Sequence, residues 1–138
     1  MPRRRVYVPL SPTQLDALAA GREAGPAPVI GYVAPAGLAP SLVEEAEHAA
    51  WLRAAQEATA FASGGRRVVG SADIDNALLE EVAPVAGGGA PVQVEIGGPI
   101  ALRRFVAFHI DEEPGGNDGD LLWYDVTELA DVRALLAL

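Results

Sequence analysis

The residues of this chain best suited to chemistry lie near its carboxyl end. His109 and Asp111 are two positions apart, and Asp125 follows in the next segment rich in hydrophobic residues. Because side chains alternate along a strand, His109 and Asp111 would share one strand face. An imidazole beside carboxylates can form an acid–base pair or supply ligands to a divalent metal. These three residues are therefore the first candidates for a site.

Two segments that resemble strands must position these candidates. Residues 105–111 and 121–126 are rich in aromatic and β-branched residues, and residues 112–120 between them hold Gly, Pro and acids. This pattern predicts a β-hairpin closed by a solvated acidic loop. One face of the hairpin is nearly all apolar and is expected to lie in the core: Val106, Phe108, Ile110, Leu122, Tyr124 and Val126.

The pairing of the two strands decides which candidates meet. We expect Asp111 to lie opposite Leu121. In that register His109 lies opposite Trp123. Asp125 is then a diagonal neighbour of His109, within reach of its imidazole. A shift of one residue would move every side chain to the other face and abolish this arrangement.

The chemical interpretation has a plainer alternative. A metal usually requires three or more ligands. Beyond His109 and Asp111 the sequence does not fix a third, since the pairing of Asp125 depends on the register and His48 lies on a distant helix. The alternative is a half-exposed histidine that packs beside Trp123. The serines lie at expected caps or turns, none in a G-x-S-x-G motif, and the glycine pairs lack a phosphate-binding pattern. The sequence therefore predicts no catalytic set, no metal and no cofactor.

Composition narrows the class of protein. The chain has 138 residues without a break in composition, which predicts a single α/β domain over residues 1–138. The formal net charge of −9 disfavours nucleic acid as a partner. All ten basic residues are Arg and there is no Cys, so lysine Schiff bases, thiolate nucleophiles and disulfides are excluded. No apolar run is long enough to span a membrane, and we expect a cytoplasmic protein with no membrane partner.

Periodicity predicts alternating strands and helices. Before the hairpin, strands are expected at residues 5–10, 29–34, 66–72 and 92–96. Helices are expected at 12–20, 41–63, 75–82 and, after the hairpin, 127–138. Ser41-Leu-Val-Glu44 has the spacing of a capping box, and Gly87–Gly89 forms a flexible loop. The predicted fold class is α+β, with a mixed sheet of about six short strands, packed with helices in a two- or three-layer sandwich, and a C-terminal hairpin and helix.

Several segments together resemble a known family. These are Arg5-Val-Tyr-Val-Pro-Leu10, Arg66-Arg-Val-Val69, residues 108–111 and the closing Leu121-Leu-Trp-Tyr-Asp-Val-Thr-Glu-Leu129. The chain resembles a family of small actinobacterial proteins of unknown function over most of its length, and its acidic loop is shorter than that family's pattern. The resemblance implies a bacterial, cytoplasmic protein and supplies no activity.

Two functions follow as hypotheses. The first is a non-catalytic module that binds another protein or itself, as a homodimer, through the hairpin face around Trp123. Arg3 and Arg5 would then form a salt-sensitive arm. The second is a small enzyme, or a ligand- or metal-binding domain. In it, His109, Asp111 and Asp125 line a pocket beside Trp123 and Tyr7. A third possibility, in which the acidic loop mimics nucleic acid and occupies a basic partner, has too few acids to be preferred.

Overall fold

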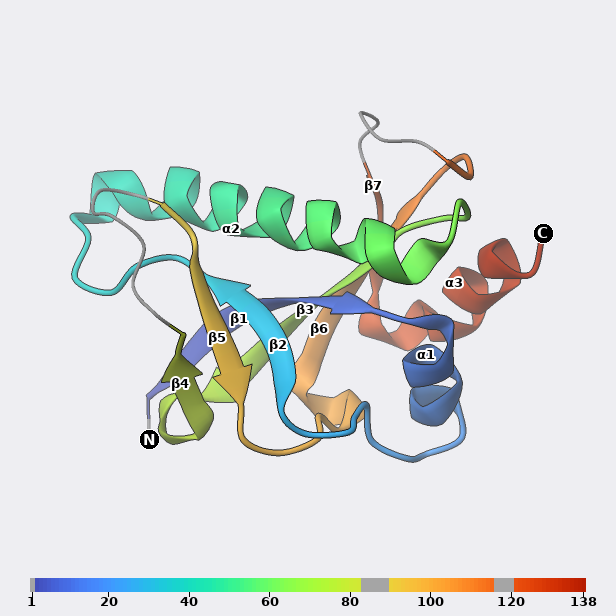
Figure 1. The fold of residues 1–138 in the computed structure, drawn as a ribbon, viewed down its shortest axis with the longest axis horizontal. Coiled ribbons are helices and arrows are strands. Elements are labelled where there is room, and N and C mark those ends of the chain that lie inside the picture. Colours follow the sequence, from blue (N-terminus) through green and yellow to red (C-terminus); the bar gives the residue numbers. More distant parts are fainter. Residues whose placement is uncertain (1, 83–89, 116–120) are drawn as a thin grey trace.

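The structure is a computed structural model that describes residues 2–82, 90–115 and 121–138. It contains a seven-stranded sheet in the order β4-β5-β2-β1-β3-β6-β7 (Figure 1). The predicted Gly87–Gly89 loop and the end of the acidic loop, 116–120, lie outside the described residues. The strands are β1 (Arg3–Leu10), β2 (Val29–Val33), β3 (Val68–Asp75), β4 (Leu79–Glu81), β5 (Val92–Ile96), β6 (Phe105–Asp111) and β7 (Leu121–Asp125). The helices are α1 (Pro12–Ala19), α2 (Pro40–Ala62) and α3 (Leu129–Leu136), with single 3-10 turns η1 (Asn76–Leu78), η2 (Leu102–Arg104) and η3 (Val126–Glu128).

Helices cover both faces of the sheet. The long helix α2 lies across one face, and α1 and α3 pack side by side against the other (Figure 1). The face of α2 toward the sheet is built from alanines, including Ala50, Ala54 and Ala58, all of them buried. Their small side chains let the helix approach the strands closely. The three-layer α+β arrangement confirms the predicted fold class.

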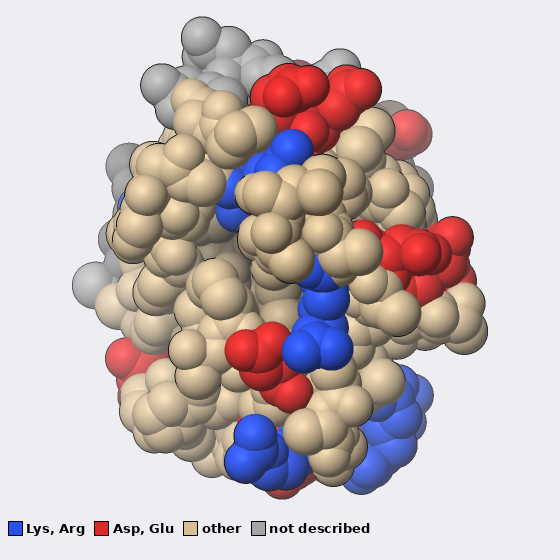
Figure 2. Space-filling view, turned by 90° about the vertical axis from the view of Figure 1, so that its right-hand side faces the viewer, with Lys and Arg blue, Asp and Glu red and all other residues tan. Residues whose placement is uncertain are grey.

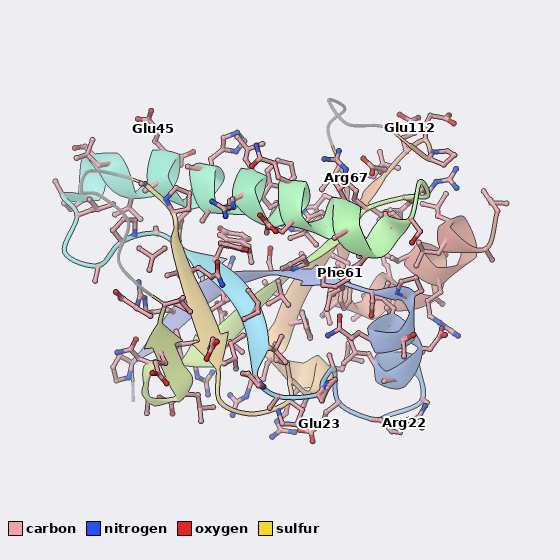
Figure 3. The ribbon with its side chains drawn as sticks, in the orientation of Figure 1. Arg22, Glu23, Glu45, Phe61, Arg67 and Glu112 are labelled. Atoms are coloured by element: carbon pink, nitrogen blue, oxygen red, sulfur yellow. The ribbon has the colours of Figure 1, made fainter. Side chains whose placement is uncertain are left out.

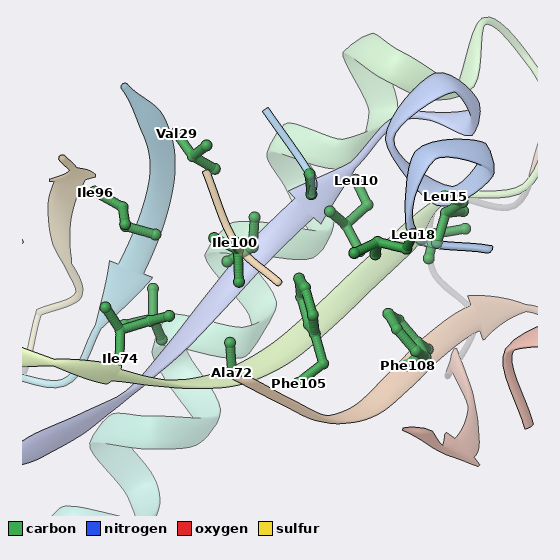
Figure 4. Close-up of a cluster of buried hydrophobic side chains, with 14 of the residues drawn as sticks. Leu10, Leu15, Leu18, Val29, Ala72, Ile74, Ile96, Ile100, Phe105 and Phe108 are labelled. Carbon is green, nitrogen blue, oxygen red and sulfur yellow. The ribbon is translucent and has the colours of Figure 1, made fainter. Parts of the chain in front are cut away.

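The larger core lies on the face opposite α2. Leucines 15 and 18 of α1 and Phe105 and Phe108 of β6 pack there with Ile100 (Figure 4). Each such side chain, fully buried, contributes roughly 1.5–3 kcal/mol to stability. This core holds the sheet in place. The other face of the same sheet, toward α2, carries polar residues.

The C-terminal hairpin forms in the expected register. Asp111 pairs with Leu121, and His109 pairs with Trp123. Both strands alternate without interruption from Ala107 onward, and a shift by one residue would turn the partners of Phe108 and Ile110 to the other face. The hairpin prediction is confirmed, and with it the shared face of His109 and Trp123.

A β-bulge corrects the predicted core face at the start of β6. Ser71 pairs with Ala107 but Ala72 pairs with Phe105, so Val106 is an extra residue on β6. The extra residue reverses the alternation at that point. Phe105, which strict alternation would place on the face of His109, therefore lies in the core and stacks on Phe108, with ring centroids 5.2 Å apart. Val106, expected in the core, is only half-buried.

Three further predictions need correction. All pairings between the described strands are antiparallel, so the parallel pairs of a mixed sheet are not found there. The predicted helix at 75–82 is the turn η1 followed by strand β4, a seventh strand too short to show a periodicity. Helix α2 begins at Pro40 with Ala39 as N-cap, so Ser41 lies inside the helix and makes no capping box. Pro40 is well suited to the first helical position, which moves the start upstream.

Opposite charges lie in neighbouring patches on the end of the molecule that carries α1 and α3 (Figure 2). Arg133 of α3 lies 3.0 Å from a carboxylate oxygen of Asp16 of α1. The guanidinium of Arg66 donates to the backbone carbonyls of Glu112 and Leu135. On this end of the molecule, acidic side chains are interspersed with basic ones (Figure 2).

Within the described ranges, no helix is both long and apolar enough to cross a membrane.

Candidate ligand-binding site

A cavity of about 500 Å³ lies between α2 and the sheet. Its size falls within the range of about 300–1,000 Å³ that is usual for small-molecule sites. The side chains that fill the space between α2 and the strands are drawn in Figure 3. The sheet supplies Arg5, Tyr7, Ser71, His109, Leu121 and Trp123, and the helix supplies Glu44, Glu47, His48 and Trp51.

Regular periodicities bring these side chains together. Arg5 and Tyr7 alternate along β1, and Tyr7 pairs with Ser71 of β3. On α2 the lining positions are 44, 47, 48 and 51, the i, i+3, i+4, i+7 spacing of one helix face. Glu45, between them in sequence, points away from the sheet (Figure 3). The cavity is therefore built from secondary structure rather than from loops.

His109 lies at the buried end of the cavity. Its side chain is 3% exposed, and its Nε2 lies 2.7 Å from Oγ of Ser71. Its ring makes edge contacts with both tryptophans, with centroids 5.7 Å from Trp51 and 4.9 Å from Trp123. Burial, and then the positive charge of Arg5, lower the pKa of His109 from 6.5 to about 4. The imidazole is therefore neutral at pH 7.

The Ser71–His109 hydrogen bond has the geometry of a nucleophile and its base. A histidine with a pKa of about 4 is a weak base at neutral pH. In the described structure, the carboxylate nearest in sequence, Asp111, is bound to Arg67 and does not orient the imidazole. At neutral pH, His109 is therefore a poorer acceptor for the Ser71 proton than a histidine with an ordinary pKa.

Trp51 and Trp123 form aromatic walls of the cavity. Trp51 stacks on His48, with ring centroids 5.5 Å apart. Its indole Nε1 is buried and, among the described residues, has no hydrogen-bond acceptor. A buried donor without an acceptor costs about 1–3 kcal/mol. Trp123 is 71% exposed at the rim, although tryptophan is usually well covered in folded proteins.

The charged groups of the cavity come from two elements. Arg5 donates from Nε to Oδ1 of Asp73 at 2.7 Å and from Nη2 to Oδ2 at 3.4 Å. These contacts raise the pKa of Arg5 and balance its charge. Burial, followed by the negative charge of Glu47, raises the pKa of Tyr7. Glu47 and Tyr7 both line the cavity, from the helix side and the sheet side respectively.

Asp111 does not line the cavity. It is 2% exposed, and its Oδ2 accepts hydrogen bonds from the backbone N and Nε of Arg67, at 2.8 and 2.9 Å. Its Oδ1 accepts a third bond from Nη2 of Arg67 at 2.9 Å. Asp111 and Arg67 therefore form a buried bidentate pair with a structural role.

The remaining expected site residues also lie elsewhere. Asp125 is exposed and accepts hydrogen bonds from the backbone N and the hydroxyl of Thr127, which lower its pKa. It caps η3, and no hydrogen bond or ion pair joins it to His109. Arg3 is exposed on β1. Since Arg3 and Arg5 belong to a paired strand, they do not form a separate arm.

The structure thus brings four of the seven expected residues to one cavity: Arg5, Tyr7, His109 and Trp123. Sequence reasoning missed six lining residues: Glu44, Glu47, His48, Trp51, Ser71 and Leu121. The four on α2 could have been found from their helical spacing. Over residues 2–82, 90–115 and 121–138, no group of three or more His, Asp or Glu is placed to hold a metal.

Comparison with known proteins gives one positive result. A family model described as a family of unknown function (DUF6912) matches residues 4–132. Neither a curated protein nor a solved structure matches the chain.

Proposed function

We propose that this chain, which belongs to DUF6912, a family of unknown function, is a non-catalytic binding protein. Its ligand occupies the cavity beneath α2. The observation that carries the proposal is that both tryptophans of the chain line this one cavity, with His109 between them. Aromatic walls with a few convergent polar groups are typical of small-molecule sites.

The exposed face of Trp123 supports binding over a purely structural role. A ligand in the cavity would cover indole surface that now faces solvent, which is favourable in proportion to the apolar area removed from water. Ser71 and His109 at the far end would fix the orientation of the ligand by hydrogen bonding. A neutral imidazole offers one donor and one acceptor for this purpose.

Because the chain has two tryptophans and both line the cavity, their indole N–H signals in a ¹H–¹⁵N NMR spectrum report on occupancy. We expect compounds from a small-fragment screen to shift both indole signals together. Trp123→Ala should weaken the binding of these compounds about tenfold. It should change the free energy of unfolding by less than about 1 kcal/mol, because Trp123 is mostly exposed.

Trp123→Phe is the matched control, since it keeps an aromatic ring at the rim and should retain most of the affinity. Circular dichroism of each variant checks the fold. A screen in which no compound moves the indole signals would contradict the proposal. Loss of the fold in Trp123→Ala would instead assign Trp123 to the core.

A second candidate function is binding of another protein, or of a second copy of this chain, through the same face. It is favoured by the position of Trp123 on β7, an edge strand of the sheet. Edge strands with exposed apolar side chains are prone to pair with other chains. If the chain self-associates in this way, its sedimentation coefficient rises with concentration and Trp123→Ala stays monomeric. A wild-type coefficient that does not change with concentration would reject self-association.

A further inference from the structure

We infer that the ligand of this cavity is a small organic cation, with an ammonium group held between aromatic rings and the carboxylate of Glu47. The inference rests on the proposed binding function and adds the chemical class of the ligand. It follows from the charges that face the cavity and from the rings that surround them.

The uncompensated charge of the cavity is negative. Two carboxylates, from Glu44 and Glu47, line it on the helix side. The one guanidinium in the lining, that of Arg5, is already paired with Asp73 through two hydrogen bonds. His109 is neutral at pH 7 and adds no positive charge. An anionic ligand would therefore meet net repulsion, and a cation would meet net attraction.

Glu47 is the carboxylate best placed to meet such a cation. Its side chain is half-buried on α2, and in the described part of the chain it has no ion-pair partner. It lines the cavity together with Tyr7 and Arg5, and its negative charge contributes to the raised pKa of both groups without forming an ion pair with Arg5. A neutral ligand that covered Glu47 would remove the water that hydrates its carboxylate and would offer no positive charge in return. A cation supplies the missing charge.

The aromatic rings favour the same class of ligand. Tyr7, Trp51 and Trp123 line the cavity, and the negative faces of such rings attract ammonium groups. Trp gives the strongest attraction of the aromatic side chains. Apolar rings combined with a nearby carboxylate thus match an ammonium group that carries an apolar body.

The test compares choline with its uncharged carbon analogue, in which a tert-butyl group replaces the trimethylammonium group. The two probes have nearly the same shape and differ in charge, so their difference isolates the cation. Binding is followed by the two indole N–H signals of the full chain. We expect choline to bind about tenfold more tightly than the analogue.

Glu47→Gln tests the role of the carboxylate, because it keeps the shape of the side chain and removes its charge. We expect it to weaken choline binding several-fold and to leave binding of the analogue unchanged. Glu45→Gln is the matched control: it removes the same charge from the same helix, on the side that points away from the sheet (Figure 3). Its affinity for choline should equal that of the wild type.

Three outcomes would overturn the inference. Equal affinity for choline and the analogue would show that the cavity ignores charge, while the proposed binding function would stand. Equal losses in Glu47→Gln and Glu45→Gln would show only a general effect of net charge. If neither probe moves the indole signals, the cation is rejected, and the fragment screen alone decides whether the cavity binds ligands.

Discussion

Replacing Asp111 by asparagine is expected to lower the free energy of unfolding by about 3–5 kcal/mol. The carboxylate accepts three hydrogen bonds from Arg67, two of them in a bidentate contact with the guanidinium, and both side chains are buried. Asparagine keeps the size of the side chain but removes the charge, and its amide group turns a donor toward the donors of Arg67. The buried guanidinium then loses the charge of Asp111, which costs far more than the loss of an exposed pair.

Chemical denaturation with urea measures this loss. Asp73→Asn is the matched control, since it also breaks an Asp–Arg pair between described strands, that of Asp73 with Arg5 at 2.7 Å. The two side chains of that pair are each 35% exposed, so solvent screens them and we expect a loss of less than about 1 kcal/mol. Similar losses in both variants would show that burial of the Asp111 pair does not govern its contribution.

Stability is expected to fall by about 3 kcal/mol between pH 6.5 and pH 4 because of His109 alone. In the unfolded chain this residue takes up a proton near pH 6.5, whereas in the folded protein it stays neutral down to about pH 4. The unfolded state therefore binds more protons in this window, so lowering the pH favours unfolding. The full slope would be about 1.4 kcal/mol for each pH unit. The histidine is half protonated in one of the two states at each end of the interval, which lowers the total to about 3 kcal/mol.

Urea denaturation at a series of pH values in the wild type and in His109→Gln separates this contribution from those of the carboxylates. The carboxylates titrate in both proteins, so the difference between the two curves belongs to His109. We expect the variant to show a shallower loss of stability below pH 6.5. His48→Gln, at an exposed position on α2, should follow the wild-type curve. Coincident curves for wild type and His109→Gln would mean that His109 is not held neutral in the folded protein.

Local patterns in the sequence predict much of the fold. The faces of the hairpin follow from the alternation of residues 107–111 and 121–125, because a shift by one residue would expose the apolar set. The start of α1 follows from Ser11 and Pro12, and the structure contains the full capping box, with Gln14 as the third residue of the helix. Each of these features is decided by residues that are neighbours along the chain.

Features decided by distant residues could not be predicted in this way. The partner of Asp111 is Arg67, which directly precedes β3, the strand next to β6 in the sheet. It is far away in sequence, and nothing in the spacing around Asp111 indicates it. An unpaired carboxylate beside His109 is the natural reading until β3 and β6 are known to be neighbours. The polar helix face containing Glu47 and Trp51 is visible as a periodicity, but its position over Tyr7 depends on how α2 lies on the sheet.

The extra residue in β6 bears on how relatives of this chain should be aligned. From Ala107 onward, odd-numbered positions of the strand face α2, but Phe105 faces the opposite side. In a relative without the extra residue, the position before Ala107 would face the core. That relative must carry its aromatic residue directly before Ala107, or lose the stack of Phe105 on Phe108. A gap of one residue at Val106 would therefore record a real change in the path of the backbone. A sequence alignment that omits this gap would match residues of the core with residues that face the cavity.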